Sequence, residues 1–207
     1  MAVICFDYDG VIADTFALES TYYLDIYKQH GIHLFETGED LRNACRGNFY
    51  EFCEKNGLTS DLLDQIFEEY NQYLEDHRIE VPLFEGIVDL LTEMLKKHSV
   101  YIVSLNDANV IASRLEKAGI AGFADILGWQ QATSKAESLP MVMKRHPNEE
   151  LYFISDSIGD MKEAVSVGFP HILAVGYGWG KRDDLLSAGA HRVFDDVASL
   201  RDYLNEV

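Results

Sequence analysis

Four mostly apolar residues are followed at once by two aspartates and a glycine in the stretch Val3-Ile4-Cys5-Phe6-Asp7-Tyr8-Asp9-Gly10. The apolar run has the length of a short buried strand. In an extended segment, side chains two residues apart lean the same way, so Asp7 and Asp9 share a side that Tyr8 does not. Gly10 permits an abrupt turn or the close approach of a ligand. The stretch predicts a strand that ends in a pair of acids.

Further along the chain, short apolar runs alternate with helical patterns. The runs that predict strands are residues 100–103, 125–128, 151–154, 171–175 and 192–194. The helical patterns cover residues 87–98, 108–117, 134–146, 158–167 and 184–187, and a last one ends at Leu204. Alternating strands and helices imply parallel pairing through right-handed crossovers. We expect an α/β fold with a Rossmann-like parallel sheet.

Residues 15–81 contain helical patterns only. A first helix starts after Asp14 or Thr15 and stops at Gly31. Thr37 is followed three residues later by an acid, which resembles a capping box for a second helix, and Thr59 precedes a third helix with one apolar face. We expect a helical cap domain at 15–81, inserted after the first strand, and an α/β core domain at 1–14 and 82–207.

The chain is strongly acidic. Its 207 residues include 17 Lys and Arg against 35 Asp and Glu, a formal net charge of −18. Such a charge repels nucleic acid and anionic membranes, and no apolar stretch approaches the length of a membrane span. Three cysteines without C-x-x-C spacing, and a start without the basic flank of a signal peptide, favour a reducing cytoplasm. We expect a cytoplasmic monomer or homodimer that binds neither nucleic acid nor membrane.

Polar residues follow four of the expected strands in order. Open α/β sheets bind ligands at the C-terminal ends of their strands. Taken singly, each polar residue is typical of a turn or a helix cap, because acids at a helix start also suit the helix dipole. Their shared position at successive strand ends predicts one site. Strand by strand, the candidates are Asp7, Asp9 and Gly10; Ser104 and Asn106; Lys135; and Asp156 with Asp160.

Three of the candidates, Asp7, Asp9 and Asp156, would repel one another unless a cation lay among them. Ligands that are all oxygen, with neither His nor Cys, select a hard cation, and Mg²⁺ fits best. A carboxylate beside such a metal can attack phosphorus. Lys135 and Ser104 can hold phosphoryl oxygens while their charge develops. The pattern indicates phosphoryl transfer.

The segment 7–15, together with Ser104, Lys135 and the segment 155–160, resembles the four motifs of the haloacid dehalogenase superfamily. The resemblance runs along the whole chain. The helical segment after the first motif is similar to the small cap of the phosphoglycolate phosphatase-like branch. One departure is Ser155, which stands where glycine is commoner in the family.

The resemblance implies a role for each matched residue. Asp7 would be the nucleophile and a ligand of Mg²⁺. Asp9 would be the general acid and then the general base, with its backbone carbonyl on the metal, so we expect its pKa to be raised. Asp156 would be the remaining protein ligand, with Asp160 behind it. Contacts to the substrate would come from Gly10, Ser104, Asn106 and Lys135.

The implied function is that of a phosphoric monoester hydrolase that depends on Mg²⁺ and acts on a small phosphorylated metabolite. Phosphoglycolate and a sugar phosphate are the leading candidates. The alternatives are a phosphomutase similar to β-phosphoglucomutase and a binding protein without turnover. Dehalogenation is disfavoured, because the family's dehalogenases lack an acid at the position of Asp9.

In the expected cap, Arg46 is the candidate that would bind a second anionic group of the substrate, such as a carboxylate or phosphate, since arginine grips these groups with two hydrogen bonds. The other interpretation of Arg46 is that it ends a helix before a stop at Gly47.

Overall fold

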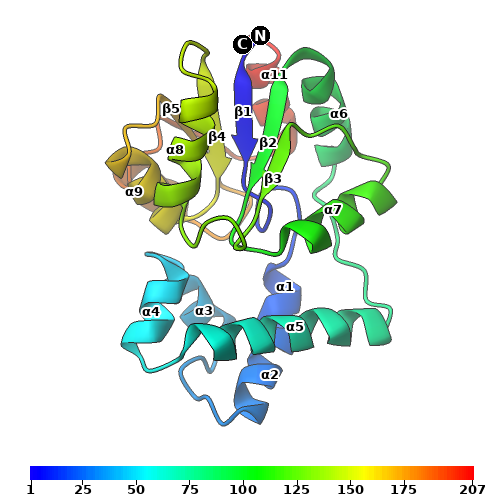
Figure 1. The fold of residues 1–207 in the computed structure, drawn as a ribbon, viewed down its shortest axis with the longest axis vertical. Coiled ribbons are helices and arrows are strands. Elements are labelled where there is room, and N and C mark those ends of the chain that lie inside the picture. The colour runs from blue at the N-terminus through cyan, green and yellow to red at the C-terminus, as the bar shows by residue number, and fades with distance from the viewer.

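A parallel sheet of six strands forms the centre of the protein, which is described for all 207 residues by a computed structural model (Figure 1). The order β3-β2-β1-β4-β5-β6 places β1 between β2 and β4. The predicted α/β fold is therefore confirmed, and no predicted strand end differs from the structure by more than one residue. The strands are β1 (Val3–Phe6), β2 (Ser99–Val103), β3 (Asp125–Leu127), β4 (Leu151–Ser155), β5 (His171–Val175) and β6 (Arg192–Phe194).

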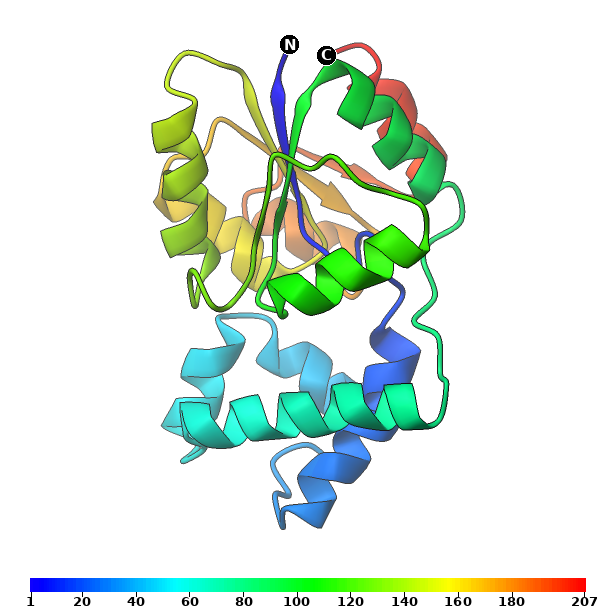
Figure 2. The same ribbon diagram turned by 45° about the vertical axis from the view of Figure 1, so that its right-hand side comes forward.

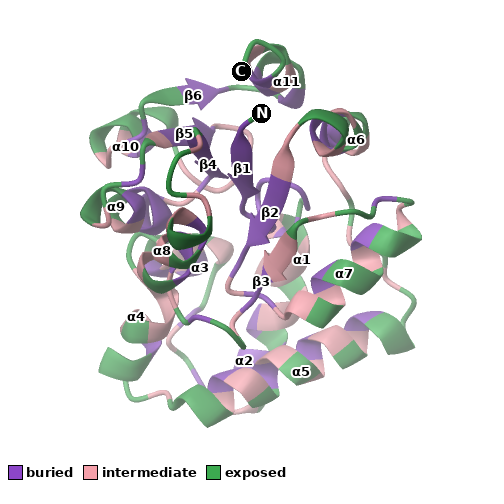
Figure 3. Cartoon of the chain, turned by 45° about the horizontal axis from the view of Figure 1, so that its top comes forward, coloured by how far each residue is buried: buried purple, intermediate pink, exposed green.

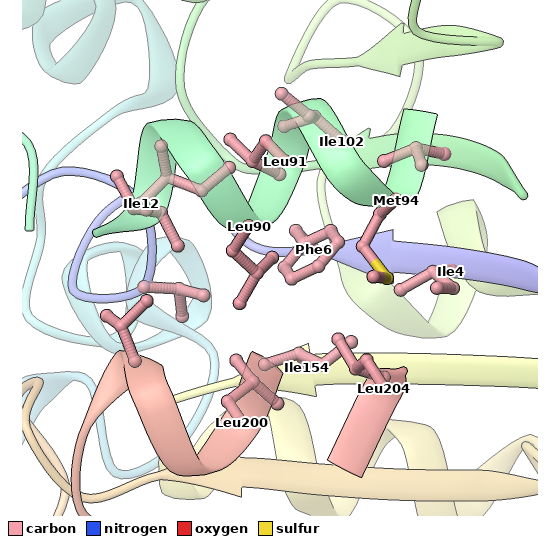
Figure 4. Close-up of a cluster of buried hydrophobic side chains, with 14 of the residues drawn as sticks. Ile4, Phe6, Ile12, Leu90, Leu91, Met94, Ile102, Ile154, Leu200 and Leu204 are labelled. Atoms are coloured by element: carbon pink, nitrogen blue, oxygen red, sulfur yellow. The ribbon is translucent and has the colours of Figure 1, made fainter. Parts of the chain in front are cut away.

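Helices cover both faces of the sheet. Successive side chains of β1 point to opposite faces, and all of them are buried, so both faces must be covered. Ile4 and Phe6 pack against the helices of one face, as Figure 4 shows. Val3 and Cys5 pack on the other. The first face carries α6 (Ile87–Lys97), α7 (Ala108–Lys117) and α11 (Val197–Leu204). The second carries α8 (Lys135–Arg145), α9 (Ile158–Ser166) and α10 (Arg182–Ser187). Figure 3 shows the buried sheet between helices that are exposed on their outer sides.

A helical segment lies between β1 and β2 and faces the C-terminal edge of the sheet (Figures 1 and 2). Its own hydrophobic cluster draws its 12 buried residues from positions 24–74 only. This separate core supports the predicted cap limits of 15–81, which stay a prediction. None of the helices in the protein has the length and apolarity needed to cross a membrane. The segment comprises α1 (Phe16–Leu18), a π-helical turn η1 (Glu19–Tyr23), α2 (Leu24–Gln29), α3 (Gly38–Ala44), α4 (Phe49–Lys55) and α5 (Ser60–Asp76).

The helix caps predicted for this segment are confirmed, but one helix was not predicted and another is less regular than predicted. Thr37 and Asp40 form a full capping box, and Thr59 caps α5. The prediction missed α4, which starts after Asn48 as N-cap in a stretch that looks like a loop. The first predicted helix is also not uniform, because the π-helical turn widens it between α1 and α2.

The packing around α6 predicts how stability depends on the main core. Leu90 has no exposed surface and lies beside Phe6 in the core of Figure 4. We expect Leu90→Ala to lower the free energy of unfolding by about 2–5 kcal/mol, because the surrounding side chains cannot fill the cavity it leaves. Urea unfolding measures this change. The matched control is Leu186→Ala on α10, where the side chain is 43% exposed and the expected change is within about 0.5 kcal/mol. Equal costs for the two variants would contradict this description of the core.

Candidate active site

The loops after β1, β2 and β4 meet at one edge of the sheet because these three strands are neighbours. They face a cavity of about 200 Å³ between the core and the helical segment. Most of the residues predicted from the sequence line this cavity. They are Asp7, Asp9, Arg46, Ser104, Asn106, Lys135, Asp156 and Asp160. Their gathering does not by itself test the roles that were predicted for them.

Asp7 is held by two donors and lies beside a hydroxyl group. Its Oδ1 accepts hydrogen bonds from the backbone N–H of Tyr8 at 2.7 Å and from Nζ of Lys135 at 3.0 Å, and its Oδ2 lies 3.2 Å from the hydroxyl of Ser155. Only 8% of Asp7 is exposed. These contacts fix the direction of the carboxyl group.

Lys135 is the buried cation of the site. It opens α8 with 2% of its surface exposed, and its Nζ also donates to the carbonyl of Val103 at 2.8 Å. Burial opposes its charge, but the carboxylates of Asp160 and Asp7 outweigh burial and raise the pKa of Lys135 above its ordinary value. The Asp160 Oδ2 atom lies 3.5 Å from Nζ. Lys135 therefore neutralises charge from two acids at once.

Asp9 has one carboxyl oxygen paired and the other unpaired. Its Oδ2 accepts a hydrogen bond from Nδ2 of Asn106 at 3.0 Å, and its Oδ1 is buried without a partner. Burial raises the pKa of Asp9, the hydrogen bond from Asn106 opposes this rise, and the charge of Asp7 adds to it. The direction predicted from the sequence for the pKa of Asp9 is confirmed.

Asp156 is a second buried carboxyl group, and the charge of Asp7 acts on it. Its Oδ2 accepts the backbone N–H of Trp179 at 2.5 Å. Burial raises the pKa of Asp156 to about 8, and the charge of Asp7 adds to the rise. Repulsion of this kind is relieved by a cation, and Asp7 and Asp156 with the backbone carbonyl of Asp9 would offer it oxygen ligands only, which a hard cation prefers. The residues therefore fit Mg²⁺, although no group of three or more His, Cys, Asp or Glu side chains is arranged to hold a metal ion.

Gly10 is needed for a close approach, but the neighbour is a protein side chain. Its φ of 74° lies in the left-handed region, and a Cβ atom there would overlap the carboxyl group of Asp156. A Cβ atom at Gly178 would meet the same carboxyl group. The two glycines thus make room for Asp156, and Gly10 is not among the residues that line the cavity. Substrate binding by Gly10 stays a prediction.

Two serines hold hydroxyl groups at the base of the site. Ser104 is buried and its Oγ accepts the backbone N–H of Asn106 at 3.1 Å, which leaves its own proton free for a ligand. Ser155 is fully buried and lies 2.7 Å from Oδ2 of Asp160 and 3.2 Å from Oδ2 of Asp7. The residue that departs from the family pattern therefore connects the predicted nucleophile to Asp160, a role that sequence reasoning missed.

Arg46 lies at the rim of the cavity, where it joins the helical segment to the core. Its Nη1 is 2.9 Å from Oδ2 of Asp184 on α10, and both side chains are partly exposed. Asn48 makes a second link, because its side-chain amide donates to Glu163 of α9 at 3.1 Å. Whether Arg46 also binds substrate stays a prediction.

Two charged residues of the cavity wall were not predicted from the sequence. Glu19 lies four residues after Thr15, in the π-helical turn, and Arg114 lies on the core helix α7. Nη2 of Arg114 donates to Oδ1 of Asn71 on α5 at 2.8 Å, across the gap between core and helical segment. The i, i+4 spacing of Thr15 and Glu19 could have suggested that the two residues share a helix face.

The chain belongs to the haloacid dehalogenase-like hydrolases, because a sequence model of that family matches residues 4–174. The resemblance found in the four motifs is thereby confirmed. Membership implies the Mg²⁺ dependence that is typical of the family. A search of curated proteins gives no match to the chain.

Solved structures share the fold along the whole chain at low sequence identity. A predicted phosphatase from Clostridium acetobutylicum is 19% identical with a TM-score of 0.80, covering 100% of this chain and 99% of its own. A candidate phosphoglycolate phosphatase from Lactobacillus delbrueckii is 21% identical with a TM-score of 0.74, covering 99% of each chain. A candidate β-phosphoglucomutase from Bacteroides vulgatus is 17% identical with a TM-score of 0.80, covering 99% of this chain and 88% of its own. At such identities the similarity establishes the fold alone.

The buried pairs of Lys135 predict a stability effect. We expect Lys135→Met to lower the free energy of unfolding by about 3–5 kcal/mol at neutral pH, because it leaves two buried carboxylates without a cation. The pKa of Lys135 is raised on folding, so its stabilisation is fully present below the ordinary value of 10.5 and is lost only as the pH rises through the folded value. Urea unfolding at neutral pH measures the cost.

The control for this variant is Lys55→Met, where the lysine forms an exposed pair with Glu51 at 3.1 Å. Its expected effect is within about 1 kcal/mol. A cost for Lys135→Met as small as that of the control would contradict the assigned ion pairs.

Proposed function

We propose that the chain is an Mg²⁺-dependent phosphatase that hydrolyses a small phosphorylated metabolite through an aspartyl phosphate on Asp7. Phosphoglycolate and a sugar phosphate are the leading candidates for the substrate. The observation that carries the proposal is the buried pair of Asp7 and Lys135, 3.0 Å apart, in the wall of a cavity that Asp9 and Ser104 also line. This is the arrangement that transfer of a phosphoryl group to a carboxylate requires.

In the first step, a carboxylate oxygen of Asp7 attacks phosphorus as the bond to the leaving oxygen breaks. Lys135 holds the carboxylate in place, because it donates to Oδ1. Ser104 has a hydroxyl proton to donate to a phosphoryl oxygen, where negative charge has to be held. Mg²⁺, held by Asp7, Asp156 and the backbone carbonyl of Asp9, would supply positive charge for the remaining phosphoryl oxygens.

Asp9 moves the proton in both steps. Protonated Asp9 donates to the leaving oxygen, so the first product departs as an alcohol. The carboxylate that remains then accepts a proton from water, which attacks the aspartyl phosphate. Phosphate leaves and Asp7 is restored. Asn106 supports this role, because its hydrogen bond holds Oδ2 and leaves Oδ1 free.

Hydrolysis is favoured over the phosphomutase alternative by the cap side of the cavity. A phosphomutase has to hold a second phosphate while the intermediate turns round. The cap arginines that could hold it, Arg42 and Arg46, already face Glu39 at 3.3 Å and Asp184 at 2.9 Å. A binding protein without turnover is disfavoured as well, because it has no use for a buried carboxylate and lysine that are costly to bring out of water.

Replacing the nucleophile tests the proposed function directly. We expect the protein to hydrolyse p-nitrophenyl phosphate with Mg²⁺, and Asp7→Asn to lower kcat by about 10³-fold or more, since the amide cannot form the intermediate. Release of nitrophenol measures the rate. The control Asp25→Asn makes the same change at an exposed position of α2 and should leave the rate unchanged.

The same assay tests the metal. EDTA should abolish turnover, Mg²⁺ should restore it, and Ca²⁺ should substitute poorly because its larger and looser shell spoils in-line geometry. Full activity in Asp7→Asn or in EDTA would refute the proposed function.

The raised pKa of Asp9 predicts a pH dependence for poor leaving groups. With 2-hydroxyethyl phosphate, whose alcohol has to be protonated as it leaves, kcat/KM should fall as the pH rises through the raised pKa of Asp9. p-Nitrophenyl phosphate has a leaving group that needs no proton, so this fall should be absent from its profile. Two profiles of the same shape would count against Asp9 as the acid.

A further inference from the structure

The loop that follows β5 takes no part in the proposed chemistry, although it lies against a proposed metal ligand. Its sequence is Gly176-Tyr177-Gly178-Trp179-Gly180. The backbone N–H of Trp179 donates to Oδ2 of Asp156 at 2.5 Å, whereas no hydrogen bond of the loop goes to Oδ1. A hydrogen bond to one oxygen of a carboxylate fixes its direction for metal binding. The loop therefore holds Asp156 by one oxygen and leaves the other to a cation.

The glycines of the loop differ in how much room surrounds them. None of the three has a φ in the left-handed region, so backbone strain does not bar alanine from these positions. A Cβ atom at Gly178 would overlap the carboxyl group of Asp156 and the carbonyl oxygen of Gly10. One at Gly180 would overlap the backbone carbonyl oxygen of Asp156. At Gly176 the nearest atoms would be 3.4 Å away. Glycine is therefore required where the loop touches Asp156, and not where it leaves β5.

The core holds the start of the loop in place. The backbone N–H of Gly176 donates to the carbonyl oxygen of Phe194 in β6 at 2.7 Å. The hydroxyl of Tyr177 donates to the carbonyl oxygen of Val11, in the turn after β1, at 3.2 Å. These two bonds fix the loop to the sheet and to the turn that carries the predicted acid and nucleophile. The contact with Asp156 therefore starts from an anchored backbone.

The side chain of Trp179 joins the loop to the cap. Its ring lies edge-on against Phe16 of α1, with the centroids 5.1 Å apart, and it packs against the hydrophobic cluster of the cap. Edge-on aromatic pairs of this kind are attractive beyond the area that they bury. Trp179 thus contacts a proposed metal ligand with its backbone and the cap with its side chain. A displacement of α1 acts on Asp156 through this one residue.

We propose that the loop 176–180 positions Asp156 for a divalent cation, and that the contact between Trp179 and Phe16 makes the affinity for that cation depend on the seating of the cap. The role assigned to the loop rests on the proposed function and specifies how its Mg²⁺ is held. Gly178 and Trp179 are positioning residues, because they act on the metal through Asp156. The dependence is reciprocal: a seated cap strengthens metal binding, and metal binding strengthens the seating of the cap.

Calorimetric titration with Mg²⁺, in the absence of substrate, tests the positioning role without relying on turnover. We expect Gly178→Ala to raise the Kd for Mg²⁺ by about 10–100-fold, the usual cost of disturbing the hydrogen-bonded surroundings of a metal ligand. The control Gly176→Ala makes the same change two residues earlier, where a Cβ atom has room, and should leave the Kd unchanged. A thermal melt without metal checks that each variant is folded. A folded Gly178→Ala variant with the Kd of the wild type would overturn the positioning role.

Two variants test the link to the cap, and neither depends on the folding of Gly178→Ala. Trp179→Ala keeps the backbone N–H and removes the indole, while Phe16→Ala removes the ring on the cap. We expect each variant to raise the Kd for Mg²⁺ by about fivefold. The control Phe52→Ala makes the same change elsewhere in the cap cluster and should leave the Kd unchanged.

The double variant Trp179→Ala, Phe16→Ala isolates the contact between the two rings. It is needed because Phe16 also lies under the guanidinium of Arg42. If both single variants act by removing the same contact, the double variant binds Mg²⁺ no more weakly than the weaker of the two. Folded single variants with the Kd of the wild type, or effects that add in the double variant, would overturn the link.

The wild-type titration distinguishes a failure of the proposed function from a failure of the loop. A wild-type protein that binds no Mg²⁺, and whose turnover of p-nitrophenyl phosphate survives EDTA, would refute the metal of the proposed function and the role of the loop with it. A wild-type protein that binds Mg²⁺, together with equal Kd values for Gly178→Ala and Gly176→Ala, would refute the role of the loop alone.

Discussion

The buried ion pair between Lys135 and Asp7 is the interaction on which the rest of the site depends. The edge of the sheet gathers Asp7, Asp156 and Asp160 within a region that water scarcely enters, and like charges so placed destabilise the fold unless they are offset. Lys135 offsets Asp7 and Asp160 through direct contacts. No cation of the chain offsets Asp156, which the Mg²⁺ of the proposed function would do. Under that proposal, stability and affinity for a hard metal ion have the same electrostatic origin.

The sheet explains why these charges come together although they are far apart in sequence. Because β1 lies between β2 and β4 and all three run parallel, the residue after each strand reaches the same edge. The alternation along β1 places side chains in the cores of both faces and holds the strand firmly. Asp7 therefore directly follows a strand that is buried on both faces. Gly10 and Gly178 then allow the turn after β1 and a later loop to close around Asp156.

The sequence predicts well those features that are encoded in short stretches, namely the strands and the acids at their ends. The strands were found because apolar runs of four or five residues have few alternatives, and the core acids because they follow those runs directly. The partners of Arg46 and Arg114 could not be predicted, since Asp184 lies 138 residues from Arg46 in the sequence and Asn71 lies 43 residues from Arg114. Glu19 was missed for a different reason: a glutamate on an amphipathic helix ordinarily faces solvent, and only the packing of the cap against the core turns this one inward. The helix α4 was missed because its N-cap, Asn48, directly follows a glycine that is typical of a helix end.

The two walls of the cavity therefore differ in what they attract. On the core side, Lys135, the hydroxyl of Ser104 and the proposed metal ion would favour a doubly charged phosphate group. On the cap side, both arginines have a carboxylate partner, and the buried polar atoms without a hydrogen bond include Nε of Arg42 and the hydroxyl of Tyr70. A ligand that suits both walls carries its phosphate at one end and a polar group at the other. Specificity then arises from the contrast between the walls, because the core wall meets the phosphate that all substrates share, whereas the cap wall meets the group that differs between them.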